Sequence, residues 1–394
     1  MAAQSMMRTR RRRTGVPIAM ALALLLVAAL TGCGSSGGDS GGTGTTSAAY
    51  LQRIDARLDA LYKGTYSEPR GPTVAPKSGE NLWVISPGES IEAAHDLSVA
   101  VQQAGSQLGW DVTVFDAKGD PSRSTPGIKQ ALADKADGII APYTDCPTIK
   151  TGLQAAKSAG VPVVGVEGSD CNELQKGDPQ LFSWVVTYND DNTPFRSWVH
   201  EWAQVQSTWL IAKTRGKADV VLGTETDSST TLLDAAAVTE QLKTCGGCSV
   251  HPLSFVVGDL GPALNNKIKE ALIKYPDANS FVAPYDAVLT LGGATALKAS
   301  GRDLQVVGGE GSAPGIQQIR EGLMDAATGI PTPWEGYAAM DALIRMFAGR
   351  KPSEATTGMG VQAVDATHNL PPEGKSYQPP IDFQAAYRGL WGLN

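Results

Sequence analysis

Histidine and cysteine are scarce in this chain of 394 residues, which has 4 His and 5 Cys. These side chains supply most protein ligands of zinc and other transition metals, so the composition argues against a metal cage, and we expect no cofactor. The chain also lacks a His-Glu-x-x-His motif, a Gly-x-Ser-x-Gly elbow and a phosphate-binding loop. These absences predict that the protein is not an enzyme.

Positive charge is in short supply outside the N-terminal segment. The formal net charge is −7, yet residues 1–32 hold five Arg and no Asp or Glu. Loss of that segment would change the net charge from −7 to −12. An acidic protein with no basic run is unsuited to the phosphate backbone, so we expect no nucleic-acid partner.

The N-terminal segment has the pattern of an export signal. The basic stretch Arg8 to Arg13 precedes an apolar run over residues 18–30, which is short for a membrane-spanning helix. The run ends in Leu30-Thr31-Gly32-Cys33, which resembles the bacterial lipoprotein box. The resemblance implies a signal peptide over 1–32, lipidation of Cys33 and an extracytoplasmic protein anchored to the bacterial cell membrane. Whether export uses the general or the twin-arginine route stays open.

Residues 33–49 are rich in Gly, Ser and Thr, a composition typical of a flexible tether. Composition alone does not separate a tether from a simple disordered terminus. From residue 50 the pattern changes, and apolar side chains fall on one helical face. Over residues 50–78 we therefore predict an N-terminal helix followed by a proline-rich arm. The apolar positions of the helix are Tyr50, Leu51, Ile54, Leu58 and Leu61.

The body of the chain alternates short apolar runs with amphipathic segments of helical length. This pattern predicts an α/β fold of two similar lobes, each a parallel sheet with helices on both faces. Ligands of such sheets bind beyond the carboxyl ends of the strands. Strands are predicted at 82–86, 111–115, 138–141, 161–166, 181–186, 219–222, 250–256, 280–283 and 305–308. Helices are predicted near 90–108, 122–134, 147–159, 193–214, 229–243, 262–274, 287–299 and 313–321.

Several segments, in this order, resemble the type I periplasmic binding proteins, the sugar-binding branch that feeds ABC importers. The resemblance covers residues 82–345. Its segments are Leu108-Gly109-Trp110 before Val112-Thr113-Val114-Phe115-Asp116, Ala136-Asp137-Gly138-Ile139-Ile140, Ala159-Gly160-Val161-Pro162-Val163-Val164, Ala283-Pro284-Tyr285-Asp286, Ala296-Leu297-Lys298-Ala299-Ser300-Gly301 and Val306-Val307-Gly308-Gly309-Glu310-Gly311. Repressors that share this fold begin with a helix-turn-helix, and here a leader, a tether and an arm occupy that place.

The resemblance implies two lobes joined by a hinge of three chain crossovers, near residues 187–192, 308–312 and 330–335. We expect lobe 1 to comprise residues 79–188 and 310–332, and lobe 2 residues 189–309 and 333–394 with the C-terminal tail. It further implies a monomeric solute-binding protein that captures a sugar, a polyol or an amino-bearing polyol between the lobes. The partner would be an ABC transporter permease. A ligand-sensing receptor subunit and an extracellular hydrolase remain alternatives.

Polar residues after the predicted strands are the candidate ligand contacts, because carboxylates and amides bind adjacent hydroxyls well. The resemblance points to Asp286, Glu310 and Glu167. Position in the post-strand loops adds Ser86, Glu92, Asn189 and Asp145, and Trp334 is a candidate aromatic face near a crossover. Tyr143 and Tyr285 are further aromatics near strand ends, whereas Trp202 is interpreted as packing.

Departures from the family pattern bear on the ligand. Gly168 follows Glu167 where sugar binders commonly carry an Arg. The loop over residues 224–230, which also commonly supplies an Arg in the family, here carries acidic and hydroxyl side chains. Carboxylates without cations are costly to bury. The sequence therefore favours a ligand with an amine, or a bound cation, and argues against an anionic ligand.

The remaining four cysteines suit an oxidising exterior. Cys146 and Cys171 lie in loops after neighbouring strands, so we predict a disulfide between them. Cys245 and Cys248 have the spacing of a redox motif, but they follow a helix, whereas a thiolate is stabilised at a helix N-terminus. A small structural disulfide is therefore the preferred interpretation there.

Overall fold

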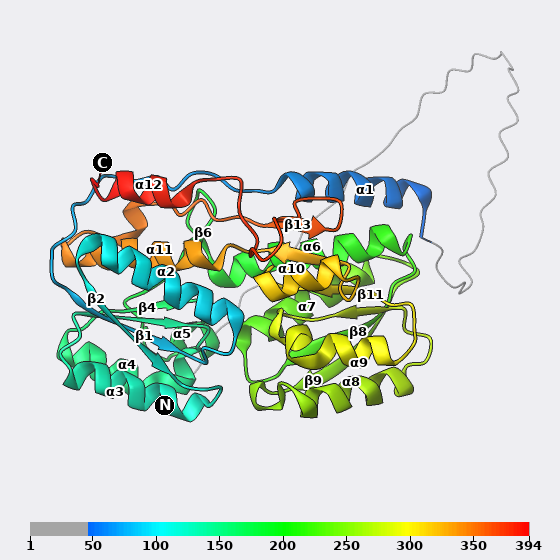
Figure 1. Cartoon of the computed structure of the whole chain (residues 1–394), viewed down its shortest axis with the longest axis horizontal. Helices are drawn as coiled ribbons and strands as arrows, with labels where there is room; N and C mark the ends of the chain where they lie inside the picture. The colour runs from blue at the N-terminus through cyan, green and yellow to red at the C-terminus, as the bar shows by residue number, and fades with distance from the viewer. Residues whose placement is uncertain (1–45, 394) are drawn as a thin grey trace, which may run out of the picture. The chain divides into compact units, whose positions relative to one another are not determined.

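The computed structural model describes residues 46–393, and strands and helices alternate through most of that range (Figure 1). The leader 1–32 and Cys33 lie outside the described residues. The strands are β1 (Asn81–Ser86), β2 (Asp111–Asp116), β3 (Gly138–Pro142), β4 (Val163–Val166), β5 (Trp184–Val185), β6 (Thr187–Tyr188), β7 (Thr193–Pro194), β8 (Asp219–Glu225), β9 (Ser249–Phe255), β10 (Ser280–Val282), β11 (Gln305–Gly308), β12 (Ala326–Gly329) and β13 (Gln362–Asp365).

The helices fill the segments between these strands and extend to the C-terminal end. They are α1 (Ala48–Lys63), α2 (Glu92–Leu108), α3 (Ser124–Ala133), α4 (Cys146–Ala159), α5 (Cys171–Leu174), α6 (Phe195–Lys213), α7 (Ser229–Lys243), α8 (Pro262–Lys274), α9 (Ala294–Ala299), α10 (Ala313–Arg320), α11 (Thr332–Phe347) and α12 (Phe383–Leu390). Short 3-10 turns are η1 (Pro121–Arg123), η2 (Val257–Asp259) and η4 (Pro352–Glu354), and a π-helical turn, η3 (Leu289–Gly293), precedes α9. No helix in the described range is both long and apolar enough to cross a membrane.

Lobe 1 is a parallel sheet in the order β2-β1-β3-β4-β5. Side chains alternate across a strand, so β1 sends Leu82 and Val84 to one face and Trp83 and Ile85 to the other. The first pair packs in the core that contains α2 and α11, and the second pair packs against α3 and α4. Both faces are thus covered, as a parallel sheet requires.

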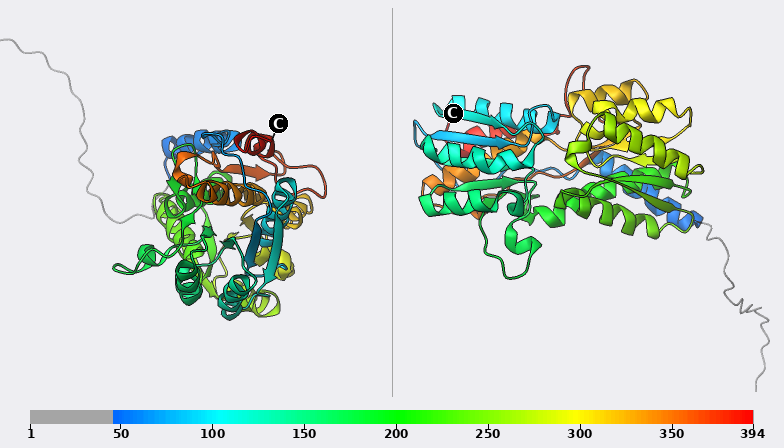
Figure 2. Two further views of the ribbon diagram at one scale, coloured as in Figure 1. Left: turned by 90° about the vertical axis from the view of Figure 1, so that its left-hand side faces the viewer. Right: turned by 90° about the horizontal axis from the view of Figure 1, so that it is seen from below.

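Lobe 2 is a sheet in the order β13-β12-β11-β10-β8-β9, parallel except for the antiparallel edge strand β13. Val220 and Leu222 of β8 face the core formed with α6 and α7, while Val221 faces α8 and α9. Figure 2, right, shows the two lobes side by side, each with its own sheet. The predicted α/β architecture of two lobes is confirmed.

The predicted assignment of segments to the lobes is wrong in its C-terminal part. Residues 310–332 contain α10 and β12, and β12 pairs with β11 in the sheet of lobe 2, not lobe 1. In turn α11, predicted within lobe 2, packs against α2 and β4 of lobe 1. The reason is that β11 does not end the second sheet, because β12 and β13 extend it. The crossovers predicted near 187–192 and 330–335 are present, but the one predicted near 308–312 is not.

The chain passes between the lobes five times within residues 46–393. Three crossings, at 186–194, 330–331 and 348–361, form the hinge. The other two come from the ends of the described range: α1 packs on α6 and β13 of lobe 2 before residues 64–80 lead to β1, and residues 366–382 lead from β13 to α12 on α11 (Figure 1). We call these two segments the N-terminal strap (64–80) and the C-terminal strap (366–382).

Candidate functional site

Hydrogen bonds between the lobes hold this structure in a closed form. The Asp145 carboxylate of lobe 1 accepts bonds from the Ser229 amide and hydroxyl of lobe 2, at 2.8 and 2.7 Å. The Ser229 hydroxyl also lies 2.8 Å from that of Ser169, and Thr230 donates to the Glu167 carbonyl at 3.1 Å. The N-terminus of α7 in lobe 2 therefore closes onto the loops that follow β3 and β4 of lobe 1.

Beneath these contacts the lobes enclose a cavity of about 90 Å³. We call it the interlobe cavity. A second hollow of about 70 Å³ shares part of its wall and includes Asp145 and Asp227. The polar and aromatic residues of the interlobe cavity are Tyr143, Glu167, Trp202, Glu225, Ser228, Thr230, Thr231, Tyr285 and Glu310. Pro87, Ile91, Ala93 and Val257 complete its wall.

The carboxyl ends of the strands place these side chains, as expected for parallel sheets. Tyr143 follows β3 and Glu167 follows β4, while Glu225 ends β8 and Glu310 follows β11. Tyr143 and Glu167 have φ values of 53° and 47°. This left-handed conformation is costly for residues other than Gly and persists only where the surroundings enforce it.

Glu167 and Glu335 form a buried acid pair on the lobe 1 side. Tyr188 and Tyr143 donate to Glu335 at 2.6 and 3.2 Å, and burial raises the pKa of Glu335 to about 7. Burial and the neighbouring Glu335 carboxyl raise the pKa of Glu167 well above its usual range. One oxygen of Glu167, Oε1, is buried and has no hydrogen-bond partner among the described residues.

Asp286 and Glu310 form the corresponding pair on the lobe 2 side. The Ser312 amide and hydroxyl both donate to Asp286 Oδ2 at 2.7 Å, and the Asp286 amide donates to Glu310 Oε2 at 3.1 Å. Burial raises the pKa of Asp286 to about 6, and burial with the nearby Asp286 carboxylate raises the pKa of Glu310 well above its usual range. Glu310 lines the interlobe cavity, whereas Asp286 lies behind it.

Glu225 is the third acid of the wall. It accepts a hydrogen bond from the Tyr285 hydroxyl, which lies beside it in the same lobe. Burial raises the pKa of Glu225 to about 7, although the bond from Tyr285 opposes the shift. An acidic side chain and an aromatic side chain are thus fixed together at the cavity.

The structure brings only some of the predicted contacts to the cavity. Glu167 and Glu310 line it, and Asp145 closes it. Ser86 is fully buried and lines neither hollow. Asn189 lies at the first crossing, where its amide donates to Glu201 at 2.7 Å.

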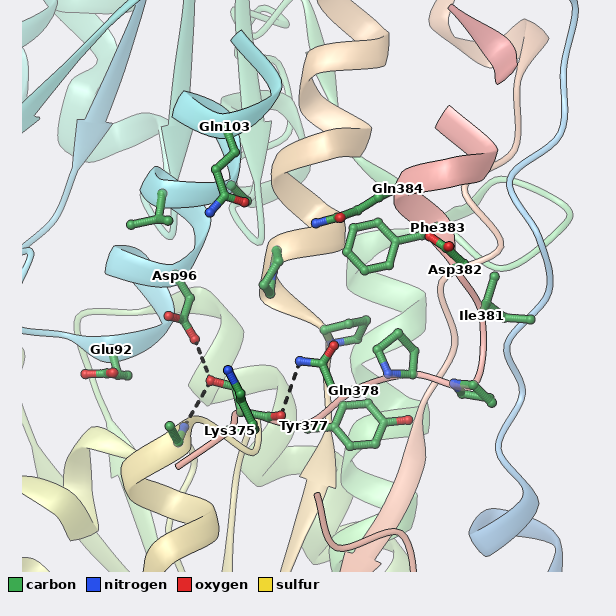
Figure 3. A pocket seen from close by; sticks show the side chains of 18 of the residues that line it. Glu92, Asp96, Gln103, Lys375, Tyr377, Gln378, Ile381, Asp382, Phe383 and Gln384 are labelled. Carbon is green, nitrogen blue, oxygen red and sulfur yellow. Dashed lines mark hydrogen bonds between the residues drawn. The ribbon is translucent and has the colours of Figure 1, made fainter. Parts of the chain in front are cut away.

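Trp334 and Glu92 also lie away from the interlobe cavity. Trp334 is buried at the hinge, stacked on Phe383 with ring centroids 5.1 Å apart. Glu92 lines a larger groove of about 810 Å³ between α2 and the C-terminal strap. Figure 3 shows this groove, in which Asp96 faces the strap and accepts a hydrogen bond from Ser376 at 3.0 Å.

Several lining residues, Trp202 and Glu225 among them, are not predicted as ligand contacts by the sequence. Trp202 repeats with Trp198 and Trp209 along one helix, a pattern typical of packing. Glu335 lies behind the wall beside Glu167, in a segment that the sequence predicts as a crossover and that the structure shows to be the first turn of α11. A helical reading of the apolar residues after Trp334 would have placed Glu335 in the first turn.

Both predicted disulfides are confirmed. Cys146 pairs with Cys171, and Cys245 pairs with Cys248. The first joins the loops after β3 and β4 that carry Tyr143 and Glu167. Among the described residues, the group closest to a metal-ligand set is Cys146, Asp170 and Cys171, and the disulfide occupies both of its sulfurs.

The family model of the periplasmic binding protein domain matches residues 82–351. The chain belongs to this family. The ribose import binding protein RbsB of Bacillus subtilis (strain 168) is 23% identical over 259 residues, which cover 65% of this chain and 77% of that protein. Its relatives are solute-binding transport proteins of the sugar-binding branch, not enzymes.

Solved structures show the same type I fold. An ABC transporter solute-binding protein from Mycobacterium smegmatis with bound glycerol has a TM-score of 0.63 at 13% identity, covering 77% of this chain and all of that one. GanP, a glucose-galactose binding protein from Geobacillus stearothermophilus, has a TM-score of 0.61 at 17% identity, covering 73% of this chain and 98% of that one. Family membership implies an extracytoplasmic location.

Proposed function

We propose that this protein captures a small polar solute, a sugar, polyol or amino-bearing polyol, between its lobes and delivers it to the permease of an ABC importer. The observation that carries the proposal is the interlobe cavity, whose polar and aromatic wall is assembled from both lobes only when they close. A solute that contacts both walls binds the closed form more tightly than the open form. It therefore shifts the population toward closure.

Each group in the wall has a role in this capture. Glu167 and Glu310 accept hydrogen bonds from the solute, and the hydroxyls of Ser228, Thr230 and Thr231 add weaker polar contacts. Tyr143 and Trp202 cover the apolar faces of the solute. Asp145 bonds to Ser229 only when the lobes meet, so this hydrogen bond is present in the closed form alone. The closed form then presents both lobes together to the permease.

We also propose that the protein acts as a monomer moored by a lipid on Cys33. The leader over residues 1–32, the Leu30-Thr31-Gly32-Cys33 box and the Gly-, Ser- and Thr-rich segment that follows it support this anchor. Growth with a labelled fatty acid tests it: label should appear on the protein and be lost in the Cys33→Ala variant, which should also be released from the membrane fraction. Labelling that persists in Cys33→Ala would contradict the anchor.

Thermal unfolding with a panel of sugars, polyols and amino sugars tests the capture itself. A solute at one hundred times its dissociation constant adds about 2.7 kcal/mol of stability, a clear rise in Tm. Glu310→Ala should weaken binding of any hit by at least about tenfold. Glu240→Ala, which changes an exposed acid on α7, is the matched control and should leave affinity unchanged. Equal affinity of both variants would contradict the site.

A further inference from the structure

The wall of the interlobe cavity carries buried carboxyl groups that have no cationic partner. Glu167, Glu225 and Glu310 line it, and no Lys, Arg or His is among the described residues that line it or the adjoining hollow. Arg196 donates to the Ser169 hydroxyl at 2.9 Å and not to any of these acids. Ionising a buried carboxyl without a cation is costly, so a cationic solute would supply a partner that the wall lacks.

Two buried carboxyl oxygens of the acid pairs, Glu167 Oε1 and Asp286 Oδ1, have no hydrogen-bond partner among the described residues. Of these two acids only Glu167, which is 3% exposed, lines the cavity. The neighbouring Glu335 carboxyl raises the pKa of Glu167, but it donates no hydrogen bond to Oε1. An unmade hydrogen bond to a buried acceptor costs about 1–3 kcal/mol, and a donor on the solute would recover that energy.

The rest of the wall distinguishes between kinds of cation. Hard metal ions take six or more oxygen ligands, whereas aromatic rings attract organic ammonium groups. Tyr143, Trp202 and Tyr285 surround the three acids here, together with apolar side chains. The hydroxyls of Ser228, Thr230 and Thr231 on the lobe 2 side suit a solute that also carries hydroxyls.

We propose that the solute is a small polyol bearing a protonated amine, whose ammonium group binds the Glu167 carboxyl in the interlobe cavity. This inference rests on the proposed function and specifies the solute class that the cavity selects. Anionic solutes are disfavoured because no lining residue in the described range is cationic. Neutral polyols lack the charge that would offset ionisation of the buried Glu167.

A dependence on pH follows from the groups that face Glu167. These are Glu335 on α11, Glu310 after β11, and the hydroxyls of Tyr143 and Tyr188, and none is cationic. Burial holds protons on the acids, as the pKa of about 7 for Glu335 shows. An ammonium group favours the charged carboxylate, so its binding should release protons, and its affinity should increase as the pH rises from 6 to 8.

Isothermal titration with matched pairs tests the inference. The probes are 2-amino-1,3-propanediol against glycerol, D-glucosamine against D-glucose, and calcium chloride alone. We expect the amine of at least one pair to bind at least tenfold more tightly than its neutral partner. Its apparent heat should differ between two buffers of different ionisation enthalpy, because protons are released.

The Glu167→Gln variant keeps the shape of the side chain and removes its charge. It should reduce amine affinity at least tenfold while changing the affinity of the neutral partner by less than threefold. Glu240→Gln removes an exposed acid on α7 and should change neither. An equal loss for amine and neutral solute would assign Glu167 a structural role and overturn the inference.

The remaining outcomes separate this inference from the proposed function. Neutral solutes that bind as tightly as amines would overturn the inference and leave the proposed capture of polyols intact. If calcium binds tightly and neither amine binds, the inference that the solute carries an ammonium group would be wrong. If no probe binds, both the proposed function and the inference are contradicted.

Discussion

Both walls of the interlobe cavity carry buried acidic side chains, but the acids differ in whether their carboxyl oxygens have hydrogen-bond partners. On the lobe 2 wall, each acid already has a partner within its own lobe: Glu225 bonds to Tyr285, and Glu310 bonds to the Asp286 amide. On the lobe 1 side, Glu335 lies behind the wall and is held by Tyr143 and Tyr188. Glu167, which lines the wall, has one oxygen with no hydrogen-bond partner among the described residues. Of the acids that line the cavity, Glu167 is therefore the one that a ligand would satisfy.

The walls also differ in how they are held. The loops that carry Tyr143 and Glu167 are joined by the Cys146–Cys171 disulfide and adopt left-handed backbone conformations. The lobe 2 wall has no such covalent link among the described residues, and side-chain hydrogen bonds position its acids. Lobe 1 thus offers a rigid wall with an unsatisfied acceptor, and lobe 2 offers a satisfied wall that closes onto it.

The largest expected effect concerns pH and involves both walls. The pKa of Glu225 in lobe 2 and that of Glu335 in lobe 1 rise from 4.5 to about 7 on folding. The folded protein therefore binds protons more tightly than the unfolded chain, so this stability is present below pH 4.5 and lost as pH rises to 7. Without solute, we expect the free energy of unfolding to fall by about 4 kcal/mol between pH 5 and 8.

Urea unfolding at both pH values measures this difference. Glu225→Gln and Glu335→Gln should each reduce the difference, because each removes one of the titrating groups. The comparison of the two variants shows which wall contributes more. Stability that is constant or increases from pH 5 to 8 would contradict the burial of these acids.

Loss of the disulfide in the rigid wall should have the next largest effect. Cys146→Ala with Cys171→Ala opens a link across a sequence separation of 25, which should lower the free energy of unfolding by about 3 kcal/mol. Cys245→Ala with Cys248→Ala is the matched control, since that link spans a separation of only 3 and lies away from the cavity. If both double variants lose the same free energy of unfolding, the Cys146–Cys171 link does not make the lobe 1 wall more rigid, and the proposed difference between the walls is contradicted.

Asp286→Ala tests whether the acids of lobe 2 act through structure. The carboxylate is 1% exposed and accepts two bonds from Ser312, the N-cap of α10. Its loss leaves buried donors unpaired, so we expect about 2 kcal/mol of destabilisation by thermal unfolding. Asp277→Ala, in an exposed turn, should have no effect. An Asp286→Ala protein of unchanged stability would show that lobe 2 does not need this acid.

The smallest expected effect concerns the contact that joins the walls. Asp145→Ala removes both bonds to Ser229 and should weaken solute binding about fivefold, equivalent to about 1 kcal/mol. Ser229→Ala removes only the hydroxyl bond and should have a smaller effect in the same titration. Scattering in solution should show a more open average for both variants. Unchanged affinity in Asp145→Ala would mean that closure does not depend on this contact.

Periodicity was sufficient to predict most of the fold. Each parallel strand is a short apolar run before an amphipathic helix, and the predicted runs from residue 82 to residue 308 all correspond to strands. Beyond residue 308 the helix predicted near 313–321 is present as α10, but β12 was missed. It is a run of small residues, Ala326–Gly329, with no β-branched or aromatic pattern apart from one Thr. The lobes were therefore assigned wrongly after that point.

The site was less accessible from the sequence. Glu167 and Glu310 could be predicted because each follows a recognisable strand. Trp202 could not be separated from Trp198, since both are buried on α6 and only the three-dimensional structure shows which one lines the cavity. Glu335, the neighbour of Glu167 in the buried acid pair, is far away in the sequence, so the sequence did not reveal the pair.

The two straps bear on how fast the protein can exchange its solute. With five backbone connections instead of three, any rotation that opens the lobes must be absorbed by backbone torsions in all five segments. The C-terminal strap is further fixed to both lobes, because the Ser376 hydroxyl donates to Asp96 of α2 and accepts from the amide of Ala313. Opening of the lobes must therefore either break one of these two hydrogen bonds or move the C-terminal strap together with both lobes, so the strap opposes rotation at the hinge.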